Sequence, residues 1–462
     1  MAARVARRAR SGAAPLIERA SPADRAFLAM DSGQVPEQFG VVLLLDDAAG
    51  LSPGQFRDLI AGRITAVPRL RQRLVRVPLG CGGPVWVDDA RFEIRNHVRT
   101  VACPPPADEQ ALLDQALAIV LTRLPRSRPL WSATLVTGLA GGQAGLVIVL
   151  HHTLADGLGG LAVLASMIDG AEDADAAADA GPAFPRPGPD RASLVAEAWQ
   201  NRLRGLGRIR QWWRLLRGSF GAAGGLAPPQ AARCSLNRAT GPRRRIVTVR
   251  VDHAELRASA HRFEATTNDA VLVAVAAAVR DVLRQRGENI SSVALAVPVS
   301  GRPSDVDGPA LGNMVSPMMV YVPATGDLAG RLADVASQVR AHKAAATGPP
   351  PIGMLGGLFR LLAAAGGYQA YMNHQHRLHT LVSHVRGPVE PVRFGGRLVT
   401  AAFPVVTGDS GNIPVFFEVL TYAGTLTVTM IADPEAMPET AELSSALRAA
   451  LVEICDLAAA HR

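Results

Sequence analysis

The stretch Gly145-Leu146-Val147-Ile148-Val149-Leu150-His151-His152-Thr153-Leu154-Ala155-Asp156-Gly157 indicates both the fold class and a candidate site. Its first six residues form an unbroken apolar run with the length and composition of a buried strand, and residues 161–168 have the pattern of a helix. Two histidines therefore stand where a strand ends and a loop begins. Catalytic groups are common at such strand ends, because rigid backbone delivers their side chains to a loop. The stretch predicts an α/β fold with a candidate site at this strand end.

The residue types in the loop suit proton transfer to and from an alcohol. An imidazole titrates near neutral pH, so it can accept a proton from a hydroxyl group and return it to a leaving group. We take His152 as the candidate general base, with His151 beside it. Asp156 either orients the ring or holds the loop through a buried ion pair, and Gly157 permits a tight turn.

Other interpretations of the same stretch stay open. A His-His-Asp metal site lacks a second cluster of ligands, and adjacent side chains on a strand point apart. Two histidines satisfied in the core are the structural alternative. Residues 157–162 also fit a G-x-G-x-x-A dinucleotide pattern, but six residues separate the strand from the first glycine. Motifs support neither phosphoryl transfer nor serine hydrolysis, since the sequence contains no Walker loop and no G-x-S-x-G elbow.

Length and composition bound the class of protein. The 462 residues are 48% hydrophobic and 19% charged, which favours a folded chain of two large domains. Four cysteines lie far apart, so the sequence indicates neither a disulfide framework nor a metal site, and a reducing cytosol fits. The net charge of +8 favours a polyanionic partner such as nucleic acid, an anionic membrane surface or coenzyme A. Aromatic residues are only 5% and no nucleic-acid motif is present, so nucleic acid ranks last.

Strand-like and helix-like stretches alternate in two halves that a linker joins. We expect a basic disordered arm at residues 1–16, an N-terminal domain at 17–185, a linker at 186–235 and a C-terminal domain at 236–462. No apolar run is long enough for a signal peptide or a membrane-spanning helix. Residues 193–216 of the linker form a basic helical pattern with a Trp pair, which suits either an anionic membrane interface or a helix packed on its own protein.

The elements expected in the C-terminal domain follow from apolar runs. They are strands at 246–251, 293–299, 415–420 and 426–431, and helices at 269–283 and 442–457.

Beyond these patterns, the chain contains the motif His-His-x-x-x-Asp-Gly at residues 151–157, the signature of the coenzyme-A-dependent acyltransferase superfamily. That superfamily includes chloramphenicol acetyltransferase and the condensation domains of peptide synthetases. From Ile17 to Leu457 the chain resembles one member of it, the bacterial wax ester synthase/diacylglycerol acyltransferase family. The segments that carry the resemblance, besides the motif, are residues 21–24 with 27–28, 67–74, 84–89 with 97–98, 126–131, 267–269, 297–300 and 311–313.

The resemblance implies a fold and an activity. We expect two chloramphenicol-acetyltransferase-like α/β domains, each a mixed β-sheet flanked by helices, with a tunnel between them. The enzyme would move a long-chain acyl group from acyl-CoA, its co-substrate, to a lipid alcohol such as diacylglycerol or a fatty alcohol, with no bound cofactor and no metal. His152 would act as the base without a covalent intermediate. The expected location is cytoplasmic, with peripheral contact to the inner membrane face or to lipid bodies.

The tetrahedral oxyanion of such a reaction needs preformed donors. We expect them among backbone amides near His152 and Gly157, and around Asn268 and Asp269, where Asn268 also suits a helix N-cap. Arg69, Arg71 and Arg73 suit either phosphate contacts or plain surface charges.

Two segments depart from the family pattern. Ser-Asn-Val-x-Gly-Pro is replaced by Ser383-His384-Val385-Arg386-Gly387-Pro388, and the Leu-Asp before the 126–131 segment by Leu124-Pro125. These changes bear on substrate preference and on the level of activity. Two alternatives stay open. One is a condensation-like enzyme of the same fold that takes its acyl group from a carrier protein. The other, which the altered Ser383-His384 segment motivates, is a non-catalytic lipid-binding protein on the same scaffold.

Overall fold

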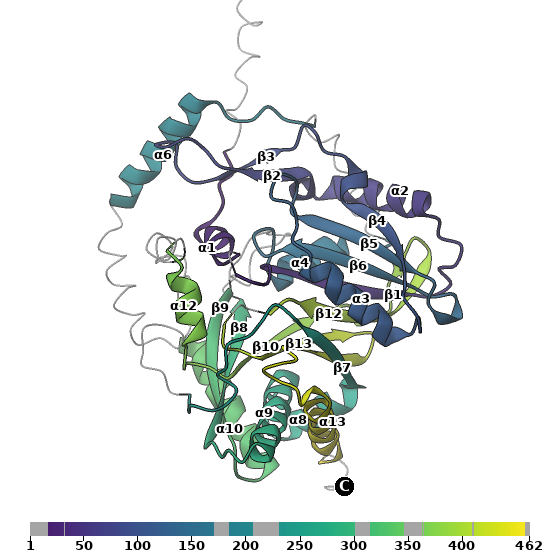
Figure 1. Ribbon diagram of the computed structural model, residues 1–462, viewed down its shortest axis with the longest axis vertical. Coiled ribbons are helices and arrows are strands. Elements are labelled where there is room, and N and C mark those ends of the chain that lie inside the picture. Colours follow the sequence, from purple (N-terminus) through teal and green to yellow (C-terminus); the bar gives the residue numbers. More distant parts are fainter. Residues whose placement is uncertain are drawn as a thin grey trace, which may run out of the picture.

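The fold consists of two mixed β-sheets, each flanked by helices (Figure 1). The computed structural model describes residues 17–31, 33–170, 184–206, 231–300, 315–345, 363, 365–408 and 411–457. The predicted basic arm, the second half of the predicted linker helix and the matching segment at 311–313 lie outside these residues. Among the residues described, no helix is both long enough and apolar enough to cross a bilayer.

The first sheet carries the stretch that opened the sequence analysis. In spatial order its described strands are β11 (Arg393–Phe394), β12 (Arg397–Val406), β1 (Gln38–Leu45), β6 (Ala144–His151), β5 (Trp131–Thr137) and β4 (Val98–Ala102). Only β4 and β5 pair in parallel. Alternate residues of β1 enter different cores: Val41, Leu43 and Leu45 pack with α2 (Pro53–Arg63), and Val42 and Leu44 with α3 (Glu109–Leu121).

Short elements complete this half of the molecule. They are α1 (Pro22–Met30), the hairpin β2 (Gln72–Val75) and β3 (Val85–Asp88), α4 (Gly157–Ala165) and α6 (Arg191–Leu206). Helix α6, part of the predicted linker, packs Leu194 against Cys81 and Val85 and forms an ion pair between Glu197 and Arg19. Its other face leaves Trp199 57% and Leu203 62% exposed. Contact of this face with a membrane stays a prediction.

The second sheet belongs to the C-terminal half. Its described strands, in spatial order, are β7 (Arg245–Asp252), β14 (Thr425–Ala432), β13 (Val415–Tyr422), β10 (Thr380–Arg386), β8 (Ser292–Ser300) and β9 (Val315–Pro323). The helices of this half are α8 (His253–Arg262), α9 (Thr267–Gln285), α10 (Leu328–Ala345), α12 (Gly367–Asn373) and α13 (Thr440–Asp456). Helix α9 is buried along most of its length between the sheet and its neighbours, α13 and α10. In Figure 1, α8, α9 and α13 lie on the side of this sheet that faces away from the first sheet.

The boundary expected at residue 236 stays a prediction, and one hairpin beyond it joins the first sheet. Strands β11 and β12 follow that boundary in sequence, yet β12 pairs antiparallel with β1. The pairing runs from Phe39 opposite Val406 to Leu45 opposite Val399. The hairpin is held there by Asp169, whose carboxylate accepts hydrogen bonds from the backbone N–H groups of Gly395 (2.8 Å) and Gly396 (2.6 Å). Apolar strands of this kind are compatible with either sheet, so sequence alone does not reveal which one β12 joins.

Candidate active site

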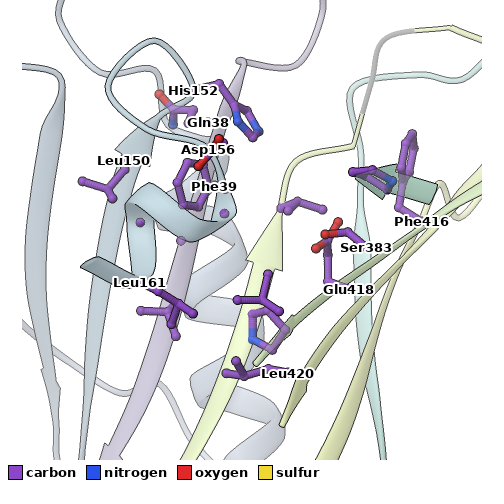
Figure 2. Close-up of a pocket in the computed structure, with 18 of the residues that line it drawn as sticks. Gln38, Phe39, Leu150, His152, Asp156, Leu161, Ser383, Phe416, Glu418 and Leu420 are labelled. Carbon is purple, nitrogen blue, oxygen red and sulfur yellow. The ribbon is translucent and has the colours of Figure 1, made fainter. Parts of the chain in front are cut away.

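A cavity of about 820 Å³ lies between the two sheets. The first sheet contributes β1, β6 and the adjoining helix α4 to its wall, and the second contributes β8, β10 and β13. Most of the lining side chains are apolar. Figure 2 shows His152 and Asp156 on the side of the first sheet and Ser383 and Glu418 on the opposite side. The interior is therefore suited to long hydrocarbon chains, with a few polar groups that fix orientation.

His152 lies on the cavity wall between two aromatic rings. Its imidazole stacks on Phe27 at a centroid distance of 5.0 Å and lies 4.8 Å from the ring of Phe39. Its backbone N–H donates to the carbonyl of Glu37 at 3.0 Å. Burial, and then the neighbouring His151, lower the pKa of His152 to about 3. The imidazole is therefore neutral at physiological pH and able to accept a proton.

His151 points away from the cavity and is only 2% exposed. Its Nδ1 accepts a hydrogen bond from the backbone N–H of Thr153 at 3.0 Å and lies 2.7 Å from the Thr153 hydroxyl. Its Nε2 is 3.3 Å from Oδ2 of Asp31. Because a backbone N–H can only donate, Nδ1 is the acceptor and Nε2 carries the proton toward Asp31. The ring thus ties the end of β6 to the residue that follows α1, and His151 does not line the cavity.

Asp31 was not identified from the sequence. Besides its contact with His151, the Asp31 carboxylate accepts hydrogen bonds from Arg123 (2.5 Å), Arg126 (2.6 Å) and the backbone N–H of Glu37 (3.1 Å). Burial alone would raise the pKa of Asp31, but the hydrogen bonds from His151, Arg126 and Glu37 outweigh it and hold the pKa well below its usual range. A single aspartate separated by 120 residues from its histidine partner leaves no periodic signal in the sequence. Its partner Arg126 was easier to single out from the sequence than Asp31, because Arg126 belongs to one of the segments that carry the family resemblance.

Asp156 is the N-cap of α4. Its Oδ1 accepts from the backbone N–H of Gly159 at 2.8 Å, and its carbonyl accepts from Gly160 at 2.7 Å. Asp156 therefore holds the loop by capping the helix. The helix begins at Gly157, four residues before the predicted start at Leu161.

The glycines of α4 allow close packing at the cavity, which corrects the turn predicted at Gly157. Gly157 is the first helical residue, and a Cβ there would lie 3.1 Å from Cγ2 of Val385 on the opposite sheet. A Cβ on Gly160 would lie 2.7 Å from the ring of Phe39. Both glycines line the cavity. The helix thus brings its N-terminal backbone amides, the positive end of its dipole, to the wall that holds His152.

Asn268 and Asp269 are placed elsewhere. They belong to the first turn of α9, and neither lines the cavity. The N-cap of that helix is Thr266, two positions before the predicted Asn268, and Asp269 completes a capping box by accepting from the backbone N–H of Thr266 at 2.8 Å. The structure therefore gives Asp269 a capping role, and neither Asn268 nor Asp269 lines the cavity.

The three arginines suggested for phosphate contact all have protein partners. Arg69 pairs with Glu18 and lies 4.3 Å over the ring of Trp86, Arg71 lies 4.3 Å over Phe184, and Arg73 is 3.8 Å from Asp89. Burial lowers the pKa of Arg69 to about 10. These contacts favour the structural interpretation of the three charges.

The altered Ser383–Pro388 segment is divided between two faces of β10. Ser383 and Val385 line the cavity. His384 points to the other face, where its Nε2 lies 3.0 Å from the hydroxyl of Thr421, and burial, followed by the charge of Arg386, lowers its pKa to about 4. The altered residue His384 therefore does not line the cavity. The second segment that departs from the family pattern is Leu124-Pro125, where the backbone N–H of Leu124 donates a hydrogen bond to Oε1 of Gln38 at 3.0 Å.

Comparison with known proteins connects this geometry to a family. Residues 20–271 match the model of the wax ester synthase/diacylglycerol acyltransferase catalytic domain, and residues 311–455 match the model of the corresponding C-terminal domain. The chain belongs to this family. It is an acyltransferase of the wax ester synthase/diacylglycerol acyltransferase type, as its sequence predicted.

Individual relatives cover nearly the whole chain. A putative diacylglycerol O-acyltransferase of Mycobacterium tuberculosis is 30% identical over 96% of this chain and 98% of its own length. A second from the same species is 28% identical over 90% of each chain. Among solved structures, the wax ester synthase/diacylglycerol acyltransferase of Marinobacter aquaeolei aligns with a TM-score of 0.65 at 21% identity, covering 96% of this chain and 100% of that one.

A peptide-synthetase domain shares the fold as well. The starter condensation domain of rhizomide synthetase aligns with a TM-score of 0.60 at 16% identity, covering 96% of this chain and 94% of its own. These alignments confirm the predicted two-domain fold of mixed sheets flanked by helices.

Proposed function

We propose that this family member transfers a long-chain acyl group from acyl-CoA to a lipid alcohol, diacylglycerol or a fatty alcohol, with His152 as general base. The observation that carries the proposal is the position of His152, a neutral imidazole on the wall of an apolar cavity of about 820 Å³. Relatives named as diacylglycerol O-acyltransferases support the choice of acceptor.

The base acts directly on the acceptor. His152 takes the proton of the acceptor hydroxyl while the oxygen attacks the thioester carbonyl carbon, so the C–O bond forms as the base becomes charged. Collapse of the tetrahedral intermediate breaks the C–S bond, and the imidazolium returns its proton to the departing thiolate. The imidazolium is stabilised only while the oxyanion is beside it, because opposite charges attract strongly in a site of low dielectric constant. No covalent enzyme intermediate is required.

The first turn of α4 supplies the donors for the oxyanion in this proposal. Gly157 and Gly160 keep side chains away from the helix end, so a carbonyl oxygen can approach the backbone amides and the positive end of the helix dipole. His151 and Asp31 fix the strand end from behind. The apolar side chains of the cavity surround the hydrocarbon chains of the two substrates, whose burial contributes about 0.8 kcal/mol per methylene group.

The test compares His152→Ala with wild type, using palmitoyl-CoA as donor and 1,2-dioleoylglycerol or hexadecanol as acceptor. Loss of a general base predicts turnover lower by about 10²- to 10⁴-fold. His261→Ala is the matched control, because His261 is exposed on α8 and its loss is expected to leave turnover unchanged. Equal turnover by wild type and His152→Ala would refute the mechanism. Turnover of an acyl-carrier-protein thioester but not of palmitoyl-CoA would refute the donor.

A further inference from the structure

Two polar side chains interrupt the apolar wall of the second sheet. Ser383 on β10 and Glu418 on β13 are register partners on adjacent parallel strands. Both line the cavity, and Figure 2 shows them across from His152. The nearest cavity-lining neighbours along the same strands are apolar: Leu381, Val385, Phe416 and Leu420. Arg386 and Tyr422 also line the cavity, at the ends of β10 and β13. Ser383 and Glu418 therefore form a polar pair with apolar neighbours, which we call the Ser383–Glu418 pair.

The environment of Glu418 keeps its carboxyl group neutral. The residue is 8% exposed, and burial raises its pKa to about 8, although a hydrogen bond with Ser383 opposes the shift. At neutral pH the protonated carboxyl carries an O–H donor in addition to its acceptor oxygens. Its register partner on β14, Thr429, has a buried hydroxyl with no hydrogen-bond partner among the described residues. The neighbouring strand therefore does not engage the carboxyl through that hydroxyl.

A buried carboxyl with so few partners is costly to keep, and such groups are concentrated at functional sites. In the proposed reaction the reacting hydroxyl and the thioester carbonyl belong at His152 and α4. A diacylglycerol carries two further ester carbonyls, which can only accept hydrogen bonds, whereas a fatty alcohol has no second polar group.

We propose that the Ser383–Glu418 pair is an acceptor-selecting subsite that donates a hydrogen bond to an ester carbonyl of diacylglycerol. The inference rests on the proposed function and deepens it, because it names what favours diacylglycerol over a fatty alcohol. A fatty alcohol in the same cavity leaves the pair without a ligand, and an unpaired buried polar group costs binding energy.

The measurement is the ratio of kcat/KM for 1,2-dioleoylglycerol to kcat/KM for hexadecanol, with palmitoyl-CoA saturating. Glu418→Leu is expected to lower this ratio about 5- to 10-fold, the effect of one hydrogen bond between neutral groups. Glu418→Gln retains an N–H donor and is expected to keep most of the selectivity. Thr429→Val, a matched control on the next strand, removes a buried hydroxyl that does not line the cavity and is expected to leave the ratio unchanged.

The pH dependence gives an independent readout. Above about pH 8 the wild-type carboxyl ionises and loses its donor, so the ratio is expected to fall, whereas the ratio of Glu418→Gln stays level. His152 remains neutral throughout this range because its pKa is about 3. The other titratable or charged side chains that line the cavity are Glu37, Asp156, Tyr368, Tyr371, Arg386 and Tyr422. Changes in these groups occur in both proteins, so a pH effect present only in wild type belongs to Glu418.

Three results would overturn the inference. Glu418→Leu could lower both activities equally, which indicates a structural role. It could instead raise the KM for palmitoyl-CoA alone, which places the pair at the donor. If Glu418→Leu does not fold, the comparison of wild type with Glu418→Gln decides, and a pH-independent ratio in wild type contradicts the proposal. Absence of wild-type turnover with both acceptors would instead refute the proposed function, so the two failures are distinguishable.

Discussion

Replacing Glu418 with glutamine is expected to stabilise the protein by an amount that grows with pH. Burial raises the pKa of the carboxyl from 4.5 to about 8. Between these values the unfolded chain has released the proton while the folded protein still holds it, so the free energy of unfolding falls as the pH rises. Each pH unit of this interval lowers the free energy of unfolding by about 1.4 kcal/mol. The contribution of Glu418 to the free energy of unfolding of wild type therefore falls by roughly 3 kcal/mol between pH 4.5 and pH 7, and it levels off above about pH 8.

The assay is urea unfolding of wild type and Glu418→Gln at pH 5, 6, 7 and 8, followed by tryptophan fluorescence. The difference in unfolding free energy between the two proteins should widen up to about pH 8, whatever its value at pH 5. Glu442→Gln is the control, because Glu442 is exposed in the first turn of α13 and its loss removes only a surface carboxylate. A difference that stays constant or narrows with rising pH would show that the folded protein already holds Glu418 ionised. The donor on which the acceptor-selecting subsite depends would then be absent.

Three further outcomes follow from the first sheet. Asp31→Asn removes a buried carboxylate that holds two arginines, and is expected to lower the free energy of unfolding by about 2–3 kcal/mol at pH 7. Because the pKa of Asp31 is lowered, urea titrations should show this difference shrinking below about pH 4. Gly160→Ala forces a Cβ against Phe39, so it should lower the free energy of unfolding by about 1–3 kcal/mol and reduce kcat. Gly62→Ala is the control, because Gly62 lies in open space on α2 and the change should not lower the free energy of unfolding. Finally, kcat/KM for hexadecanol should be level from pH 5 to pH 8, since His152 titrates near pH 3; a rise with a midpoint near pH 6.5 would contradict its buried, neutral state.

Local patterns were sufficient for most of the fold. The apolar run before His151 is β6, and the long apolar helix expected at 269–283 is α9, extended by two residues at each end. Helix α4 shows where such patterns are insufficient. Its three glycines, at 157, 159 and 160, have low helix propensity, so the predicted start fell after them. The available signal was Asp156, an N-cap residue type three positions before the N–H group it caps.

The site depends on contacts that leave no local pattern. The strand end predicts a base at residue 152, but neither Asp31 beneath it nor Glu418 across the cavity belongs to a motif. Both are identified only through pairing between distant segments: His151 with Asp31 across 120 residues, and β10 with β13 in parallel register. Sequence reasoning therefore nominated His152 as the candidate base. It missed Asp31, which contacts the neighbouring His151, and Glu418, which lines the opposite wall of the cavity.

The crossing of β12 into the first sheet explains how the two walls of the cavity keep their spacing. After β12 ends at Val406, the next strand along the chain is β13, which begins at Val415, carries Glu418 and belongs to the second sheet. Consecutive strands of the chain therefore lie in different sheets. Tyr422, at the end of β13, connects these sheets: its hydroxyl donates to the carbonyl of Val399 on β12 at 2.8 Å and accepts from the N–H of Val392 at 2.9 Å. A cut at the linker would therefore separate the halves in sequence but leave the first sheet without β11 and β12. Because His152 and Glu418 act from opposite sheets in our proposals, this crossing of β12 is what holds the base and the acceptor-selecting pair in one cavity.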